Sequence, residues 1–121
     1  MKKYLAEMIG TMVLVLMGCG TAVSLNCGLD TASVVGTAMA FGLAVVAMAY
    51  TIGGISGCHI NPAITLGCLL TGRISGKDAG MYMIFQVIGA FIGSALLYVL
   101  VSGLTPEGTA TGANTCAGGV V

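Results

Sequence analysis

The stretch SGCHINPAITLG, residues 56–67, decides how this chain is expected to fold. Asn61 belongs to the residue types that cap helix N-termini, and Pro62 suits the first helical position. The apolar run that follows offers about ten helical residues, which at about 1.5 Å per residue make a helix of about 15 Å. That length is half of a hydrocarbon core of about 30 Å. The pattern predicts a half-helix over residues 61–71 whose start lies near the middle of a bilayer.

The composition of the whole chain supports a membrane protein. Of the 121 residues, 57% are hydrophobic and 7% are charged, and the mean hydropathy is +1.05. Soluble domains carry about 25% charged residues, so this chain has too few charges to cover a surface in water. Three stretches have the length and polarity of membrane-spanning helices, namely 4–25, 33–53 and 80–102. We therefore predict an all-α membrane protein with three transmembrane helices and one re-entrant half-helix.

The basic residues predict how the chain is oriented. They are Lys2, Lys3, Arg73 and Lys77. If the N-terminus is cytoplasmic and the short helix re-enters from the same side, all four lie inside, as the positive-inside rule expects. If the short helix crossed the membrane, Arg73 and Lys77 would lie outside. The charges thus favour re-entry independently of the motif, and they predict a multi-pass protein of the cell (inner or plasma) membrane with a cytoplasmic N-terminus.

The segment before Asn61 has the features of a polar path through the membrane. Irregular backbone at membrane depth is tolerated only where it is buried in protein or lines a wet cavity. Gly53-Gly54 and Gly57 are expected to supply the turns of this segment. Asn61 offers an amide donor at a helix N-terminus, which carries about half a positive charge. We expect the carbonyl groups before it to line the path, those of Gly57, Cys58, His59 and Ile60. Such a path suits neutral hydrogen-bonding molecules and disfavours cations and protons.

Other classes of function find no support in the residues. The sequence has no nucleophile–base pair, paired carboxylates or phosphate-binding loop, so no enzyme and no cofactor is expected. The net charge is zero, which does not favour nucleic acid as a partner. The five cysteines show no metal-ligand spacing, so no metal is expected. Cys27 and Cys116 lie in predicted loops, and the sequence leaves their pairing open.

The residues from His59 to Gly67, HINPAITLG, resemble the signature around the first Asn-Pro-Ala box of the aquaporin and glycerol facilitator (major intrinsic protein) family. Four further motifs resemble the N-terminal half of the same family, especially bacterial water channels of the aquaporin Z type. These motifs are AEMIGT at residues 6–11, GCG at 18–20, AFGL at 40–43 and QVIGA at 86–90. The resemblance extends from about residue 4 to about residue 103, in the family's order and spacing.

The resemblance implies a passive water channel and roles for particular residues. Asn61, Pro62 and Ala63 would form the pore motif, and Phe41 would be the aromatic member of the selectivity filter. Phenylalanine at that position favours water over glycerol. Glu7 and Gln86 would brace the re-entrant loop. Each residue also has an ordinary explanation: Asn61 as a plain helix cap, Phe41 as a packing residue and Glu7 as an acid that reaches toward the interface.

The resemblance covers one of the family's two inverted repeats. Residues 1–103 are expected to form this aquaporin-like repeat, and residues 104–121 an extracytoplasmic loop truncated before a fourth span. The expected partners are water or glycerol, the lipid bilayer, and a second aquaporin half or full-length relatives, and the family implies a homotetramer. Two alternative functions remain: a facilitator of glycerol or another small neutral solute, and a non-conducting half-channel that binds other membrane proteins.

Overall fold

The computed structural model of this protein describes residues 1–104, which form four helices and no strand. The helices are α1 (Lys2–Ser24), α2 (Thr31–Ser56), α3 (Pro62–Leu70) and α4 (Gly76–Leu104). By length and composition, α1, α2 and the part of α4 from Gly76 to Gly103 can each cross a membrane, whereas α3 is far too short. This architecture confirms the predicted all-α membrane fold.

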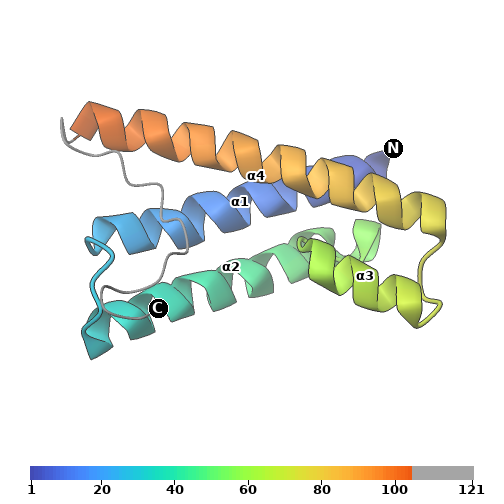
Figure 1. Ribbon diagram of the computed structural model, residues 1–121, viewed down its shortest axis with the longest axis horizontal. Coiled ribbons are helices and arrows are strands. Elements are labelled where there is room, and N and C mark those ends of the chain that lie inside the picture. The colour runs from blue at the N-terminus through green and yellow to red at the C-terminus, as the bar shows by residue number, and fades with distance from the viewer. Residues whose placement is uncertain (105–121) are drawn as a thin grey trace, which may run out of the picture.

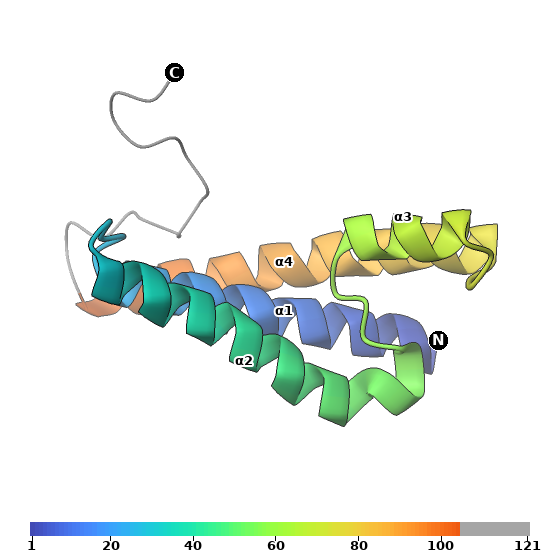
Figure 2. The same cartoon turned by 90° about the horizontal axis from the view of Figure 1, so that it is seen from below.

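The helix α1 lies between α2 and α4, and it packs against both of them (Figure 1). The short helix α3 packs beside the first half of α4 (Figure 2). The chain leaves α2 at the end of the bundle that holds the N-terminus, turns back toward the middle, and begins α3 there. The α3–α4 connection returns to that same end (Figure 1).

The helix α2 is longer at both ends than the sequence predicts. At its start, the Asp30 carboxylate accepts hydrogen bonds from the amide and the hydroxyl of Ser33, at 3.1 and 2.7 Å. These bonds, the hydroxyl's first, hold the pKa of Asp30 below its usual value. At the other end, the prediction that Gly53-Gly54 form a turn is wrong. The Gly53 carbonyl accepts from the Gly57 amide at 2.9 Å, so the helix continues to Ser56.

The helix α4 begins at Gly76, four residues before the predicted span. The hydroxyl of Ser75 accepts a hydrogen bond from the Asp78 amide at 3.2 Å, and the Ser75 carbonyl accepts from the Ala79 amide. The Asp78 carboxylate then pairs with the Lys3 ammonium group at 2.7 Å. Lys77 and Asp78 therefore lie in the first turn of α4, where an acidic side chain is favourable.

Two predictions concern residues beyond the described part of the chain. Apart from Leu104, the predicted loop over residues 104–121 lies outside it. Cys116 lies there too, together with any pairing to Cys27. Within the described residues the Cys27 thiol is exposed and free.

Candidate functional site

The carboxylate of Glu7 is the centre of the candidate site. Its side chain is fully buried, with 0% of its surface exposed. One oxygen, Oε1, accepts from the Ser56 hydroxyl at 2.7 Å and from the His59 amide at 2.9 Å. The other, Oε2, accepts from the Ile60 amide at 2.7 Å and from the Gln86 side-chain amide at 2.8 Å. A buried acid in a membrane protein requires such partners, and here they join α1, α2, the following loop and α4.

The loop between α2 and α3 has an uncommon backbone conformation. Gly57 has φ 88°, which glycine adopts without strain, and it ends α2 as a left-handed cap. Cys58 and Ile60 also have positive φ values, 52° and 43°. A positive φ is costly for a β-branched residue such as Ile60 and persists only where surrounding contacts hold it. The bond from the Ile60 amide to Glu7 is one such contact.

The hydrogen bonds of the loop amides determine where its carbonyl groups point. The amide of Cys58 donates to the Ser56 hydroxyl at 3.1 Å, and the amides of His59 and Ile60 donate to Glu7. In a trans peptide the carbonyl and the next amide point in opposite directions, and no described peptide bond is cis. The carbonyl groups that precede these amides therefore point away from Glu7 or, at Gly57, away from the Ser56 hydroxyl. They are those of Gly57, Cys58 and His59.

These carbonyl oxygens, together with that of Ile60, accept no hydrogen bond from any residue in the range 1–104. Buried or membrane-embedded carbonyl groups require a hydrogen-bond donor. The loop thus has two chemically different sides. One side donates to Glu7 and Ser56, and the other presents a row of free acceptors.

Asn61 caps α3 with its oxygen and leaves its nitrogen free. The side-chain Oδ1 accepts from the Ala63 amide at 2.8 Å. The side-chain NH₂ group makes no hydrogen bond within residues 1–104, and Asn61 is exposed, as are Pro62 and Ala63. Because the cap uses the oxygen, the free group is a donor. It lies at the N-terminus of α3, where the helix dipole is positive.

A second set of hydrogen bonds extends from Glu7 across α4 to α3. The Gln86 nitrogen donates to Glu7 and also to the Thr65 hydroxyl at 3.0 Å. Thr65 is in turn 2.9 Å from Nδ1 of His59. The tautomer of the His59 ring sets whether Nδ1 accepts from the Thr65 hydroxyl or donates to it. Gln86, Thr65 and His59 therefore act as one hydrogen-bonded unit.

Three residues of the site were not among those singled out by the sequence. They are Ser56, Thr65 and Tyr82. The Tyr82 hydroxyl donates to the Ser56 carbonyl at 2.7 Å, which satisfies an otherwise free carbonyl at the end of α2. Its ring packs edge-on against His59, with the ring centroids 5.1 Å apart. One signal was available, because Tyr82 and Gln86 are four residues apart and must share a helix face.

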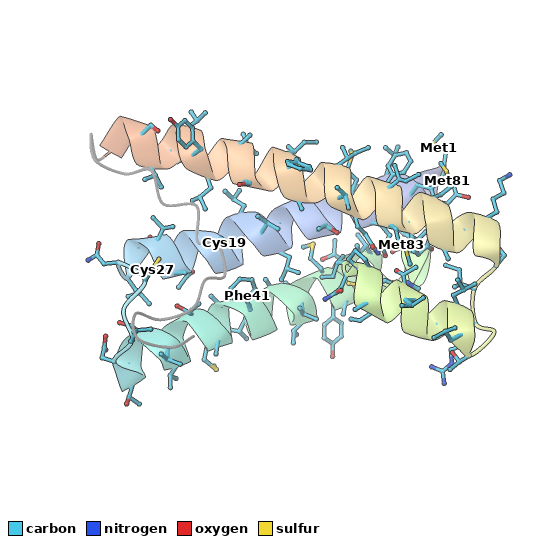
Figure 3. The ribbon with its side chains drawn as sticks, in the orientation of Figure 1. Met1, Cys19, Cys27, Phe41, Met81 and Met83 are labelled. Carbon is cyan, nitrogen blue, oxygen red and sulfur yellow. The ribbon has the colours of Figure 1, made fainter. Side chains whose placement is uncertain are left out.

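Phe41 lies elsewhere in the structure. It is half-buried on α2, and its ring packs against Gly18 of α1. Figure 3 shows it beside the part of α1 that carries Cys19. Phe41 lies fifteen positions before Ser56 in α2, which is about 22 Å at about 1.5 Å per residue. The structure therefore brings Glu7, His59, Asn61 and Gln86 together at one level and places Phe41 at another.

The comparisons with known proteins identify the family of the chain. The family model for the major intrinsic protein matches residues 1–120. Aquaporin Z of Rhodopseudomonas palustris is 53% identical over 103 residues, which are 84% of this chain and 42% of that protein. Aquaporin Z of Bradyrhizobium diazoefficiens is 50% identical over 105 residues, 85% of this chain and 43% of that protein. Glycerol uptake facilitator protein-like 6 of Lactiplantibacillus plantarum is 44% identical over 112 residues, 93% of this chain and 50% of that protein.

The chain thus spans about half the length of the curated relatives it matches. Within that length the match includes the helices, the loop and the Asn61 cap described above. The chain belongs to the major intrinsic protein family.

Proposed function

We propose that this chain supplies one half of a passive transmembrane pore for water. The observation that carries the proposal is the two-sided loop of residues 57–60, whose amides are held by Glu7 and Ser56 while its carbonyl groups stay free. The free donor of Asn61 follows directly after these acceptors. A row of acceptors that leads to a donor suits neutral molecules which both donate and accept hydrogen bonds. The positive end of α3 opposes cations and protons.

The choice of water rests on the relatives and on Phe41. Two of the matched relatives are named Aquaporin Z. By family resemblance, Phe41 is the aromatic residue of the selectivity filter, and phenylalanine there favours water. A facilitator of glycerol or another small neutral solute is the second candidate, because a relative named as a glycerol uptake facilitator-like protein matches 93% of the chain. Family membership also supports the prediction that the chain is a channel component and not an enzyme.

A complete pore in this proposal requires a second half-helix. The chain spans about half of its relatives, and the described residues contain one short helix of this kind. In folds with inverted repeats the conducting site lies where the two repeats meet at the midplane. A second aquaporin half, or a full-length relative, is therefore the proposed partner, and the homotetramer of the family stays a prediction. Two copies of this chain would need opposite orientations to complete one pore.

The distribution of charge supports one orientation for all copies. The N-terminus and the α3–α4 connection lie at the same end of the bundle (Figure 1). That end therefore carries all four basic residues: Lys2 and Lys3 at the N-terminus, Arg73 in the connection and Lys77 in the first turn of α4. By the positive-inside rule we propose that it is cytoplasmic, in the inner or plasma membrane.

Osmotic shrinkage of proteoliposomes, followed by stopped-flow light scattering, tests the proposal. The chain is reconstituted alone and together with the remaining half of the Rhodopseudomonas palustris relative. We expect shrinkage above the lipid rate in the combined sample, and its loss in Asn61→Asp, because aspartate keeps the cap oxygen but replaces the free donor with an anionic acceptor. The control is Asp30→Asn, a matched exchange at the N-cap of α2, which should leave the rate unchanged.

Three outcomes would count against the proposal. Shrinkage at the lipid rate, although the two halves co-purify, would favour a non-conducting half-channel. Fast shrinkage that Asn61→Asp does not alter would separate the water path from the Asn61 donor. Fast shrinkage with this chain alone would show that it makes a pore without another half.

A further inference from the structure

The backbone conformation at Gly18 does not require glycine. It lies within α1, and its φ is not positive. Glycine in a helix interior destabilises the helix by about 0.5–1 kcal/mol relative to alanine. A glycine at such a position is therefore expected where a larger side chain would not fit. Gly18 is buried. A Cβ atom at Gly18 would overlap three atoms of the Phe41 ring, Cε1, Cδ1 and Cζ, and would lie 2.6 Å from Cζ.

The neighbouring Gly20 provides the contrast. A Cβ atom at Gly20 would meet its nearest neighbour, Cδ1 of Leu97, at 3.6 Å, which is an ordinary van der Waals contact. Gly18 and Gly20 lie in the same helix, two residues apart, and both precede the end of α1 at Ser24. Of these two glycines, only Gly18 leaves no room for a side chain, because the ring of Phe41 occupies that space.

We infer that Gly18 is a specificity-determining position of the channel, because its missing side chain forms the seat that sets the position of the Phe41 ring. The inference rests on the proposed function, in which Phe41 belongs to the selectivity filter. A methyl group at position 18 would have to stand about 3.5 Å or more from the ring carbons, so the ring would move away from α1 by about 1 Å. The ring is half-buried, and it can yield only toward the side that α1 does not fill.

A displacement of this size changes what a narrow pore admits. Selectivity for neutral solutes depends on pore diameter and on the groups that line the pore. In the proposed pore the path lies on the side of the ring that faces away from α1, so a ring displaced from Gly18 narrows the path. A narrower path excludes glycerol before it excludes water. Gly18→Ala should therefore lower the ratio of glycerol to water permeability. Gly18 does not touch the permeating molecule in this scheme and acts through Phe41, as a positioning residue.

Two measurements test this inference separately from the proposed function. The first places 4-fluorophenylalanine at position 41 of the full chain and records its ¹⁹F NMR signal in detergent micelles. Gly18→Ala should shift that signal, and the matched control Gly20→Ala should not. An unchanged signal in Gly18→Ala, with the protein folded by circular dichroism, would overturn the inference whether or not the channel conducts.

The second measurement is the ratio of glycerol to water permeability in the combined proteoliposomes described above. We expect Gly18→Ala to lower this ratio by about threefold or more, and Gly20→Ala to leave it unchanged. In a Phe41→Ala background, Gly18→Ala should have no further effect, because its route to the pore is gone. An additive effect of Gly18→Ala in that background would overturn the role of Phe41 as the intermediary. A shifted NMR signal with an unchanged ratio of glycerol to water permeability in a conducting assembly would overturn the specificity role of Gly18. It would not contradict the proposed pore.

Discussion

The two sides of α1 use glycine in opposite ways. On the side of α4, the two glycines in close contact, Gly89 and Gly93, belong to α4 and face the backbone of α1. A Cβ atom at Gly89 would overlap the Met8 carbonyl oxygen, and one at Gly93 would lie 2.7 Å from the Met12 carbonyl oxygen. The spacing Gly89-x-x-x-Gly93 is the small-residue pattern that allows close approach of membrane helices.

On the side of α2, the two glycines in closest contact, Gly10 and Gly18, belong to α1 and face side chains. Gly10 accommodates Cδ1 of Ile52 and Cγ2 of Ile60, where a Cβ atom would stand 2.6 and 2.7 Å away. Gly18 accommodates the ring of Phe41. Ile60 belongs to the candidate loop, and Phe41 is the proposed filter residue. The contact between α1 and α2 therefore positions a residue of the loop and the residue that we propose for the filter.

The comparison separates a rigid contact from an adjustable one. A carbonyl oxygen of a helix cannot move without moving the helix, whereas a side chain can change rotamer or be exchanged. The interface between α1 and α4 therefore sets the distance between the two helices. The interface between α1 and α2 sets the positions of individual side chains. We expect substitutions there to cost less stability and to be compensated by a second substitution.

Gly89→Ala should have the largest effect on stability. The added methyl group meets the Met8 carbonyl oxygen, so the helices must separate, at a cost of about 3 kcal/mol or with loss of folding. Unfolding by sodium dodecyl sulfate, followed by circular dichroism, measures this loss. The control Gly80→Ala lies in the same helix with open space around it and should be neutral or stabilising. Rescue of Gly89→Ala by Met8→Ala would contradict a backbone contact, because that exchange leaves the carbonyl in place.

Glu7→Gln should have the next largest effect on stability, because Glu7 is hydrogen-bonded across both helix interfaces, to Ser56 of α2 and to Gln86 of α4. Glutamine has one acceptor oxygen where the carboxylate has two, and its NH₂ group would face donors. We expect a loss of about 2–3 kcal/mol.

Hydrogen exchange would show where the effect of Glu7→Gln lies. The amides of His59 and Ile60 should exchange faster, while those in the middle of α4 stay protected. The control is Thr11→Val, because the Thr11 hydroxyl donates only to the Glu7 backbone carbonyl within α1. Unchanged exchange at residues 59 and 60 in Glu7→Gln would show that other contacts hold the loop.

Gly10→Ala should have the smallest effect of the three, about 1–2 kcal/mol, because only side chains need to move. Ile52→Val removes the Cδ1 atom that stands in the way, so the double variant should recover part of the lost stability. The same unfolding experiment measures both variants. If Ile52→Val restores none of the stability lost in Gly10→Ala, the α1–α2 interface is as rigid as the α1–α4 interface and the comparison fails.

The sequence predicts the helices well because their signals are local. Hydropathy identifies the three long helices, and Asn61-Pro62 marks the start of α3. The errors also have local causes. Gly53-Gly54 can form a turn, but nothing nearby forbids a helix, and the amide of Gly57 continues the hydrogen-bond pattern of α2. The first turn of α4 looks like a connection because it is charged, until Lys3 is seen to pair with Asp78.

The candidate site is predictable only in part. Glu7, Asn61 and Gln86 stand out as polar residues in or beside apolar stretches and through family resemblance. Ser56 and Tyr82 do not, because small hydroxyl residues and tyrosines are common in such helices. Their roles depend on a bond between residues 26 positions apart, from the Tyr82 hydroxyl to the Ser56 carbonyl. No pattern within a single helix encodes that pairing.

By itself the sequence determined that this chain is a membrane protein with three long helices and a capped half-helix, because hydropathy and capping depend on neighbouring residues. Only the tertiary structure decided that Glu7 collects the loop amides, that the loop carbonyls point away from it, and that Gly18 faces the ring of Phe41. Those features join residues on different helices, up to 79 positions apart for Glu7 and Gln86. They depend on which helix faces meet, and that is a property of packing.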